Sequence, residues 1–468
     1  MSGHPRRGHP RRWFIYISSG MLIFLFLAII LVAFLLLRQG RIPRTGMITG
    51  SSMEPILRGP RFAWTCSHCD RLQEFALDTC KSGQPFRCQL CNHLEMQSQI
   101  DFSDSAVVAD RINPGEQVLF SNLRSIRATR RAEIATQLAQ PSGLRRGDIL
   151  VFQEQQDAIR EVKRVVAFAD EHVAIIDGDI YVNAKRWCKS LEQSLRQSIL
   201  VHSWERSSLL QATNPSRKAN AFWRTDKGEF SGAIGGSINV SGVIDNSNSN
   251  SIFFSNDSKS PMDNRLAVNA HDSHAIVPVS DFGIAFQPSN IEAAWGIECE
   301  FNTPFIKASM SMQFDGRSVR IRVGEQSINA ELIQRQDRSV WIVIGMIDGH
   351  LIGGSQDEEW FRLELPDPSS DKSSASAKAN SSPPITISAA SGRLELDQLL
   401  VFHDIHYRGQ NDSVSQSWPS HDRLVVLGDN VSSSSDSRDR WPEGLPSYSA
   451  KGVVLPTENP MEVLLRQR

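Results

Sequence analysis

The sequence has almost no net charge, few cysteines and no internal repeat. Its 50 lysines and arginines nearly balance its 52 aspartates and glutamates, so the formal net charge is -2. Nucleic-acid binding relies on a positive field that this chain lacks, and we expect no nucleic-acid partner. Seven cysteines are too few for a disulfide scaffold in a chain of 468 residues. The length predicts two or three folded units joined by linkers.

Charge is also missing from residues 13–37, which are apolar almost throughout. As a helix this run is long enough to cross a bilayer core of roughly 30 Å. A cleaved signal peptide has a shorter apolar stretch and a small-residue cleavage site, and neither is present. We therefore expect a permanent transmembrane helix at 13–37 behind a cytoplasmic tail at 1–12. The flanking arginines favour this orientation slightly, which places the rest of the chain on the exoplasmic side of the cell membrane.

Strand patterns dominate the remaining sequence and predict a mainly β protein. Short apolar runs bounded by glycine and proline occur on both sides of a long polar-rich region. These runs lie at 116–122, 148–152, 160–168, 174–183, 423–430 and 452–455. Within the fourth run, Asp177 and Gly178 are typical of a hairpin turn.

Residues 189–420 differ from what flanks them. Polar low-complexity stretches around 245–263 and 367–384 indicate solvated loops. Strand patterns between and after them predict a second all-β unit, a sandwich that looks somewhat like a laminin-G or concanavalin-type domain. We interpret it as an insert of unknown role, placed where the two chain ends lie close together.

Four short motifs follow the apolar run in a fixed order. The first, ITGSSMEPIL, contains a Gly-x-Ser-Met-x-Pro pattern formed by Gly50, Ser52, Met53 and Pro55. RRGDILVF at 145–152 and EVKRVVAF at 161–168 come next, and the second of these contains Lys163. The last motif, at 428–441, contains Gly428, Asp429, Asn430, Ser434, Asp436, Ser437 and Arg438.

This ordered set resembles the conserved boxes of type I signal peptidases, which are membrane-bound serine endopeptidases with a Ser/Lys dyad. The resemblance implies a β catalytic core built from residues 42–188 and 421–468. It implies Ser52 as the nucleophile and Lys163 as the general base. The implied substrates are exported preproteins with small residues at the first and third positions before the cut, bound as an added β-strand.

The chemistry of such a dyad is intelligible from the residues themselves. A serine hydroxyl is a poor nucleophile near neutral pH and needs a base within hydrogen-bond reach. A lysine serves only when neutral, and lowering its pKa from about 10.4 to about 8 costs on the order of 3 kcal/mol, which desolvation can supply. The valines around Lys163 are suited to this, and strand alternation sends Arg164 to the opposite face. Catalysis of this kind needs no cofactor.

The supporting residues are assigned by resemblance. The backbone N–H of Ser52 is implied as one oxyanion donor. Some family members place a serine hydroxyl where this chain has Gly50, so the second donor stays unidentified. Ser434 is implied to orient the lysine amine. Asp429, Asp436 and Arg438 are interpreted as structural, with Asp436 and Arg438 joined by charge-assisted hydrogen bonds.

Five of the seven cysteines lie between Cys66 and Cys91. Cys66 with Cys69, and Cys88 with Cys91, form two CxxC pairs about 18 residues apart, a spacing typical of a zinc ribbon. We expect a structural zinc in an insert at 62–96, without a part in the Ser/Lys chemistry. Disulfides in an oxidising compartment are the alternative, and Cys80 or His68 are possible substitute ligands.

Two other functions remain open from the sequence. The chain could be a membrane-tethered binding protein in which the peptidase core is an inactive scaffold. It could also be a Ser/Lys protease that cleaves itself, although the apolar run and the lack of a DNA-binding motif argue against the repressor type.

Overall fold

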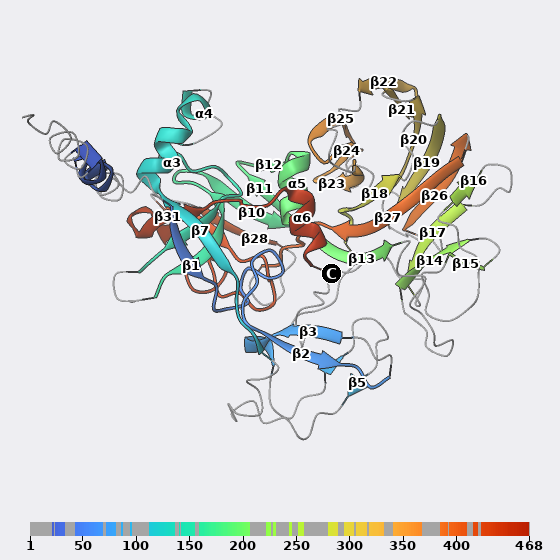
Figure 1. The fold of residues 1–468 in the computed structure, drawn as a ribbon. Helices are drawn as coiled ribbons and strands as arrows, with labels where there is room; N and C mark the ends of the chain where they lie inside the picture. Colours follow the sequence, from blue (N-terminus) through green and yellow to red (C-terminus); the bar gives the residue numbers. More distant parts are fainter. Residues whose placement is uncertain are drawn as a thin grey trace, which may run out of the picture.

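The computed structural model describes most of the chain outside the N-terminal region and the long polar loops. The described residues are 21–22, 24–32, 43–68, 72–80, 86–87, 94–95, 112–135, 140, 142–154, 159–205, 221–225, 228–230, 243–245, 251–256, 279–288, 294–303, 306–315, 318–331, 340–366, 384–391, 393–409, 415–419 and 423–467. Figure 1 shows a sheet-rich unit on the left, a larger β unit on the right and a small ribbon below. The mainly β fold expected from the sequence is confirmed.

The first unit contains a seven-stranded sheet assembled from both ends of the chain. In spatial order its strands are β1 (Arg44–Met47), β7 (Gln117–Asn122), β31 (Ala450–Val454), β8 (Ile149–Phe152), β9 (Glu161–Ala167), β29 (Arg423–Leu427) and β30 (Leu445–Pro446). Strand β31 lies between β7 and β8, and β29 pairs with β9. The last part of the chain therefore completes a sheet that the first part begins.

A four-stranded sheet packs against this one. Its order is β12 (Lys185–Arg186), β11 (Asp179–Val182), β10 (His172–Ile176) and β28 (Ser415–Pro419). The β10–β11 turn contains Asp177 and Gly178, both with positive φ, as a hairpin requires. A Cβ at Gly178 would lie 2.0 Å from the His406 ring, so the close approach also demands glycine. Strand β28 falls in the 189–420 range, yet it pairs with β10.

The second unit is a sandwich of two antiparallel sheets. One sheet contains β13 (Ile199–Glu205), β27 (Arg393–His403), β18 (Phe282–Pro288), β23 (Ile342–Ile347), β24 (His350–Ser355) and β25 (Glu358–Glu364), with β16 (Val243–Asp245) paired to β27. The other contains β15 (Gly228–Phe230), β14 (Ala221–Thr225), β17 (Ser251–Asn256), β26 (Ile385–Ser391), β19 (Trp295–Asn302), β20 (Lys307–Asp315), β21 (Ser318–Val323) and β22 (Gln326–Glu331).

A single apolar core fills the space between these two sheets. It includes Phe282 and Ile344 from one sheet and Trp295, Met312 and Phe314 from the other. Burial alternates along β20, so one face of the strand is in the core and the other faces solvent. The rings of Trp295 and Phe314 stack with centroids 3.7 Å apart. This packing supports the expectation of a β-sandwich.

Helices join the two units. Helices α3 (Leu123–Thr129) and α4 (Arg131–Ala135) follow β7, whereas α5 (Leu191–Gln197) and α6 (Pro460–Leu465) contact each other. Ser190 and Asn459 begin α5 and α6 with complete capping boxes. Leu195 of α5 and Leu464 of α6 pack on the outer face of the sheet that contains β18. The sequence analysis predicted none of these four short helices.

The cysteine-bearing segment forms the small ribbon at the bottom of Figure 1. Strand β2 (Arg61–Thr65) pairs with β3 (Leu72–Ala76) and β6 (Ile112–Asn113), and β4 (Phe86–Arg87) pairs with β5 (Leu94–Glu95). A short 3-10 helix, η1 (Leu77–Thr79), follows β3. Cys66, directly after β2, is buried. Cys69, Cys88 and Cys91 lie outside the described residues.

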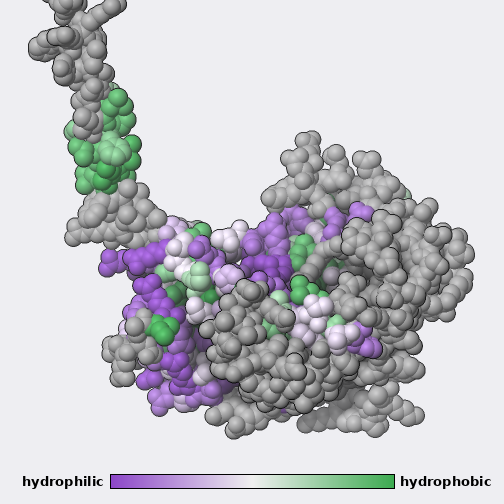
Figure 2. All heavy atoms as spheres, turned by 60° about the horizontal axis from the view of Figure 1, so that its bottom comes forward, coloured by the Kyte–Doolittle hydropathy of each residue, from purple (hydrophilic) through white to green (hydrophobic). Residues whose placement is uncertain are grey.

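Residues 21–22 and 24–32 are helical, and most of their apolar side chains are exposed. Figure 2 shows them as a green surface that stands away from the mostly hydrophilic surface of the described residues visible in this view. The other residues of the predicted span, at 13–20, 23 and 33–37, are not among those described. Within the described parts of the chain, no helix combines the length and the apolar character needed to cross a bilayer.

Candidate active site

The Ser-Met-x-Pro motif forms a tight turn, which we call the nucleophile turn (residues 50–57). The N–H of Glu54 donates to the Ser51 carbonyl over 2.9 Å, and the N–H of Leu57 donates to the Met53 carbonyl over 2.9 Å. The Met53 side chain is fully buried in a small core with Phe120 and other residues of the seven-stranded sheet. Methionine thus anchors the turn, while Ser52 beside it stays partly exposed.

A buried ion pair holds the far side of the nucleophile turn. Glu54 pairs with Arg61 of β2 and accepts the N–H of Gly59 over 2.9 Å. Burial raises the pKa of Glu54, although Arg61 opposes this. Arg466, just after α6, donates to the Ile56 carbonyl over 2.6 Å. The sequence analysis predicted neither contact, because Glu54 stands at the variable position of the motif and Arg466 lies far away in the chain.

The loop that follows β29 contacts the nucleophile turn directly. We call residues 428–438 the serine loop. The N–H of Asn430 donates to the Ser52 carbonyl over 3.1 Å, and the Ser51 and Ser433 hydroxyls lie 3.0 Å apart. A Cβ at Gly428 would lie 2.5 Å from the Ser52 carbonyl oxygen and 2.0 Å from Ser434 Oγ. Glycine is therefore needed there for the loop to approach the turn.

Lys163 is in the middle of β9, opposite Leu150 of β8, and only 2% of it is exposed. Burial lowers its pKa, while the negative charge of Asp436 is the largest influence in the opposite direction. The next residue, Arg164, lies opposite Leu427, one position before the serine loop. The sheet thus brings a buried amine to the edge of the loop that contacts Ser52.

Asp436 organises the serine loop. Its carboxylate accepts two hydrogen bonds from the Arg438 guanidinium, over 2.8 and 2.7 Å. It also accepts the Gly428 N–H over 2.8 Å and the Ser434 hydroxyl over 2.9 Å. Burial alone would raise the pKa of Asp436, but Arg438 and these N–H donors outweigh it and the pKa is lowered. The carboxylate is therefore ionised at neutral pH, and the predicted pair with Arg438 is present.

Asp429 forms its ion pair with a different arginine from the one that binds Asp436. Arg164 donates to it through Nε over 2.7 Å, and both side chains are buried. The Tyr407 hydroxyl donates to the same carboxylate over 3.4 Å. Arg164 does point away from Lys163, yet it is buried in a second polar cluster. Neither Arg164 nor Tyr407 was among the predicted site residues, because nothing in the sequence links either one to Asp429.

The structure brings most of the predicted site residues together around the serine loop. Asn430 links the serine loop to the Ser52 carbonyl, and Gly428 and Ser434 both donate to Asp436. The negative charge of Asp436 also acts on the Lys163 amine. On the opposite side of the turn, Asp78 accepts the Ser51 N–H. Of the four predicted zinc ligands, Cys66 is described and buried at the end of β2.

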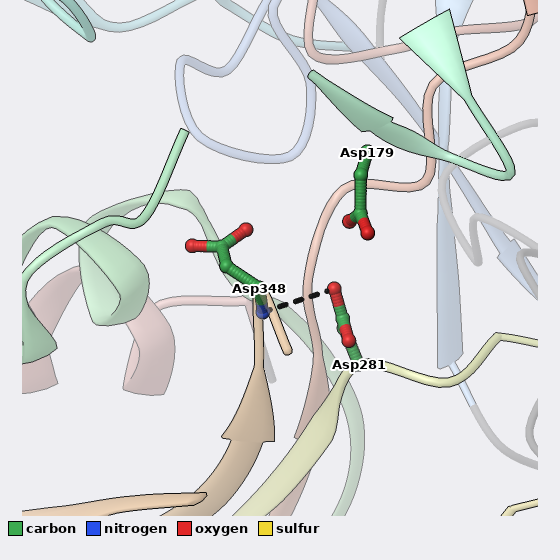
Figure 3. A group of neighbouring side chains, drawn as sticks. All are labelled: Asp179, Asp281 and Asp348. Atoms are coloured by element: carbon green, nitrogen blue, oxygen red, sulfur yellow. Dashed lines mark hydrogen bonds between the residues drawn. The ribbon is translucent and has the colours of Figure 1, made fainter. Parts of the chain in front are cut away.

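A separate acidic cluster lies where the four-stranded sheet meets the sandwich. Figure 3 shows the carboxyl groups of Asp179, Asp281 and Asp348 near one another, with the Asp348 N–H donating to Asp281. Asp179 directly follows the β10–β11 turn, as the first residue of β11. Asp281 directly precedes β18, and Asp348 is in the β23–β24 turn. The cluster was invisible in the sequence because its members are far apart in the chain.

Two cations partly neutralise this cluster. Lys189 Nζ lies 2.6 Å from Asp348 and 2.8 Å from Asp404, and Arg186 Nε lies 3.2 Å from Asp179. Four carboxyl groups thus face one ammonium and one guanidinium. Burial raises the pKa of Asp179 to about 6 and that of Asp404 to about 7, although the nearby cations oppose the shifts.

Comparison with known proteins identifies one family. The model of the signal peptidase family, peptidase S26, matches residues 103–230. The match includes Lys163 but not the nucleophile turn or the serine loop. Residues 103–230 are therefore similar to signal peptidases, which supports a peptidase. No curated protein matches the chain.

Solved structures resemble the chain only weakly. The binding domain of botulinum neurotoxin serotype D is 9% identical, covers 44% of this chain and 48% of its own, and has a TM-score of 0.23. A galectin from Caenorhabditis elegans is 11% identical, covers 28% of this chain and 93% of its own, and has a TM-score of 0.18. The chain thus spans about half the length of the first of these. At such TM-scores, neither likeness carries an argument.

Proposed function

We propose that this chain is a membrane-bound serine endopeptidase that removes signal peptides from exported preproteins, with Ser52 as nucleophile and Lys163 as general base. The observation that carries the proposal is a lysine that is 2% exposed and has a lowered pKa, at the edge of the loop that contacts Ser52. An amine desolvated in this way can be neutral near physiological pH, as a base must be.

In the proposed mechanism, the neutral amine of Lys163 accepts the proton of the Ser52 hydroxyl as its oxygen attacks the scissile carbonyl carbon. The bond to the leaving amine then breaks, and the proton passes from Lys163 to that amine. Water, activated by the same lysine, hydrolyses the acyl-enzyme. The Ser52 N–H serves as one donor to the oxyanion.

Ser434 is suited to orient the lysine. Its hydroxyl donates to Asp436, so its oxygen has lone pairs left to accept an N–H from the neutral amine. Such a bond would turn the lone pair of the amine toward Ser52. Asp436 is itself held by hydrogen bonds from Arg438 and from the Gly428 N–H. These bonds support a preorganised position for the Ser434 hydroxyl.

The preprotein substrate would bind as an added strand. Among the described strands, β1 is at the edge of the seven-stranded sheet and ends five residues before Ser52, so a strand added beside it would lead to the nucleophile. We place this site on the exoplasmic side of the cell membrane, anchored by residues 13–37 in the lipid bilayer.

Catalysis by this dyad uses no cofactor, and we assign zinc only a structural role. The proposed ligands are Cys66, Cys69, Cys88 and Cys91, which would close the ribbon that contains β2 and β3. Metal analysis of the purified chain should find about one zinc per chain, lost in a Cys66→Ala, Cys69→Ala variant. Paired disulfides without metal would contradict this assignment.

A cleavage assay tests the proposed function. The full-length protein in detergent or liposomes is mixed with a preprotein that has small residues before the cut. Ser52→Ala and Lys163→Met should each lower kcat by at least about 10³-fold, because each removes one partner of the dyad. Activity of the wild type should fall as the pH is lowered, because protonated Lys163 cannot act as a base.

Control variants separate chemistry from folding. Lys185→Ala, at an exposed lysine of β12, and Ser435→Ala, at an exposed serine of the serine loop, should retain activity. Equal cleavage by the wild type and both dyad variants would exclude the mechanism. No cleavage by any form would favour a binding protein with an inactive scaffold, and release of a self-fragment without preprotein would favour self-cleavage.

A further inference from the structure

The cysteine-bearing ribbon contacts the nucleophile turn through Asp78 as well as through Arg61 of β2. Asp78 Oδ2 accepts the Ser51 N–H over 2.9 Å. The same oxygen lies 3.7 Å from the place where a Cβ of Gly50 would be. The carboxylate therefore binds Ser51 and lies close to Gly50, the two residues that directly precede Ser52, and it comes from a segment that was expected to have no part in the chemistry.

The backbone that carries Asp78 is held in place by hydrogen bonds and by a buried neighbour. It lies in η1, where the Leu77 N–H donates to the Pro60 carbonyl over 2.9 Å and the Thr79 hydroxyl donates to the Ala76 carbonyl over 2.7 Å. Ala76, just before η1, is fully buried. The position of the carboxylate is thus set by the ribbon rather than by a loose loop.

The nucleophile turn is consequently held from two sides. The serine loop contacts it through Asn430, which donates to the Ser52 carbonyl, and through Ser433, whose hydroxyl meets that of Ser51. Asp78 takes the Ser51 N–H from the ribbon side. Ser52 therefore lies in a backbone segment that is clamped at the residue before it and at its own carbonyl.

We propose that Asp78 is a positioning residue for the nucleophile: its hydrogen bond to the Ser51 N–H fixes the turn so that the Ser52 hydroxyl faces the base. This inference rests on the proposed function and extends it by giving the ribbon a part in catalysis. Asp78 is exposed, so its bond contributes little to folding. Its effect on rate can still be large, because a misplacement of about 1 Å at a reacting group can cost about 10²-fold.

The role predicts a particular pattern among variants. Asp78→Ala removes the acceptor, and kcat should fall about tenfold while KM stays within about twofold, because the substrate itself is not contacted. Asp78→Asn keeps an oxygen that can accept the same N–H, so it should restore kcat to within about threefold of the wild type. Asp357→Ala, at an exposed aspartate in the β24–β25 turn, serves as the matched control and should change neither parameter.

Amide hydrogen exchange of the full-length protein supplies a readout that does not depend on activity. Peptides covering the nucleophile turn should exchange faster in Asp78→Ala than in the wild type or in Asp78→Asn, with no change in the sandwich. An unchanged kcat in Asp78→Ala would overturn the proposal. So would increased activity, which indicates inhibition by the carboxylate, or an equal loss in both variants with a raised KM, which indicates a substrate contact.

The proposed function and the role of Asp78 can be disproved separately. A wild type that cleaves no preprotein defeats the proposed function, and the catalytic role of Asp78 with it, whatever the exchange data show. A wild type that cleaves, together with unchanged exchange and unchanged kcat in Asp78→Ala, defeats only the role of Asp78.

Discussion

Two buried polar clusters in this molecule differ in how their carboxyl groups are paired with cations. Around the serine loop, Asp429 and Asp436 each receive an arginine fork, from Arg164 and Arg438. At the boundary with the sandwich, several carboxyl groups share Lys189 and Arg186, and the pKa of Asp404 is raised to about 7. Asp436, which has its own guanidinium, has a lowered pKa, whereas Asp179 and Asp404 lie in a cluster with more carboxyl groups than cations and have raised pKa values.

This difference matters for function. In the proposed mechanism, the serine loop must keep its shape over the pH range in which Lys163 is neutral, and Asp436, with its lowered pKa, does not titrate there. In the boundary cluster, the pKa values of Asp179 and Asp404 are raised to about 6 and about 7, so these two carboxyl groups titrate close to neutral pH. The two clusters should therefore respond differently to mutation and to pH.

The largest effect is expected from breaking a buried pair near the serine loop. Arg164→Met leaves Asp429 buried without its guanidinium and should destabilise the first unit by about 3–5 kcal/mol. Chemical unfolding followed by fluorescence measures this. Arg440→Met is the matched control, since Arg440 pairs with Glu154 and Glu161 at the surface, and its loss should cost less than about 1 kcal/mol. Equal losses in the two variants would contradict the expectation.

A smaller effect is expected where the serine loop meets the nucleophile turn. In Gly428→Ala the new methyl group would collide with Ser434 Oγ and with the Ser52 carbonyl, so the loop must move away. We expect a loss of about 1–3 kcal/mol in stability and a lowered kcat. Gly46→Ala, where a Cβ meets only ordinary contacts with Phe120, should change both by little. Full activity in Gly428→Ala would show that the close approach is unimportant.

The boundary cluster predicts a pH dependence of stability. The folded-state pKa values of Asp404 and Asp179 are raised to about 7 and about 6, so their contribution is fully present below about pH 4 and is lost as the pH rises through these values. His406 acts oppositely, because burial lowers its pKa to about 4 and its contribution is lost as the pH falls below about 6.5. The combined contribution of the two carboxyl groups to the unfolding free energy is larger than the opposite contribution of the imidazole.

The unfolding free energy should therefore increase as the pH falls from 8 to 5, on the order of 1–2 kcal/mol. Denaturant unfolding at a series of pH values measures the slope. Asp404→Asn should flatten it, and His406→Gln should steepen it. A wild-type curve that falls throughout this range would show that the cluster is neutralised in another way.

The smallest effect is expected at Gly50. The position has room for a side chain, since a Cβ there meets only Asp78 Oδ2 at 3.7 Å. Gly50→Ser should change stability by less than about 0.5 kcal/mol. We expect kcat to stay within about threefold, because the new hydroxyl donates to Asp78 rather than to the oxyanion. A tenfold rise in kcat would instead mean that the hydroxyl supplies the missing second donor.

The positions of several strands were visible in the sequence, because they depend on local signals. The runs that became β7, β8, β9 and β31 are short, apolar and bounded by turn residues, and Asp177–Gly178 and Asp348–Gly349 form the hairpin turns that such pairs favour. The short helices α5 and α6 were missed. Each has two turns or fewer, and its apolar residues could equally belong to strands.

In the candidate site, too, the residues in local motifs were predicted and their distant partners were not. Ser52, Lys163, Ser434 and Asp436 were predicted because each is part of a motif, and the serine loop contacts the Ser52 carbonyl through Asn430 and contains the Ser434–Asp436 hydrogen bond. The partners that hold them were not found. Asp78 is an exposed aspartate in an unrelated segment, and only the folding of the ribbon against the nucleophile turn brings it to Ser51.

By itself, the sequence determined the features that depend on residues close together in the chain. These are the apolar run, the alternation of strands, the turn glycines and the composition of the motifs. Only the tertiary structure decided that β28 pairs with β10, that Arg164 neutralises Asp429, and that four distant aspartates meet at the boundary of the sandwich. Charge pairing and desolvation depend on distances between segments hundreds of residues apart, and periodicity along the chain carries no information about those distances.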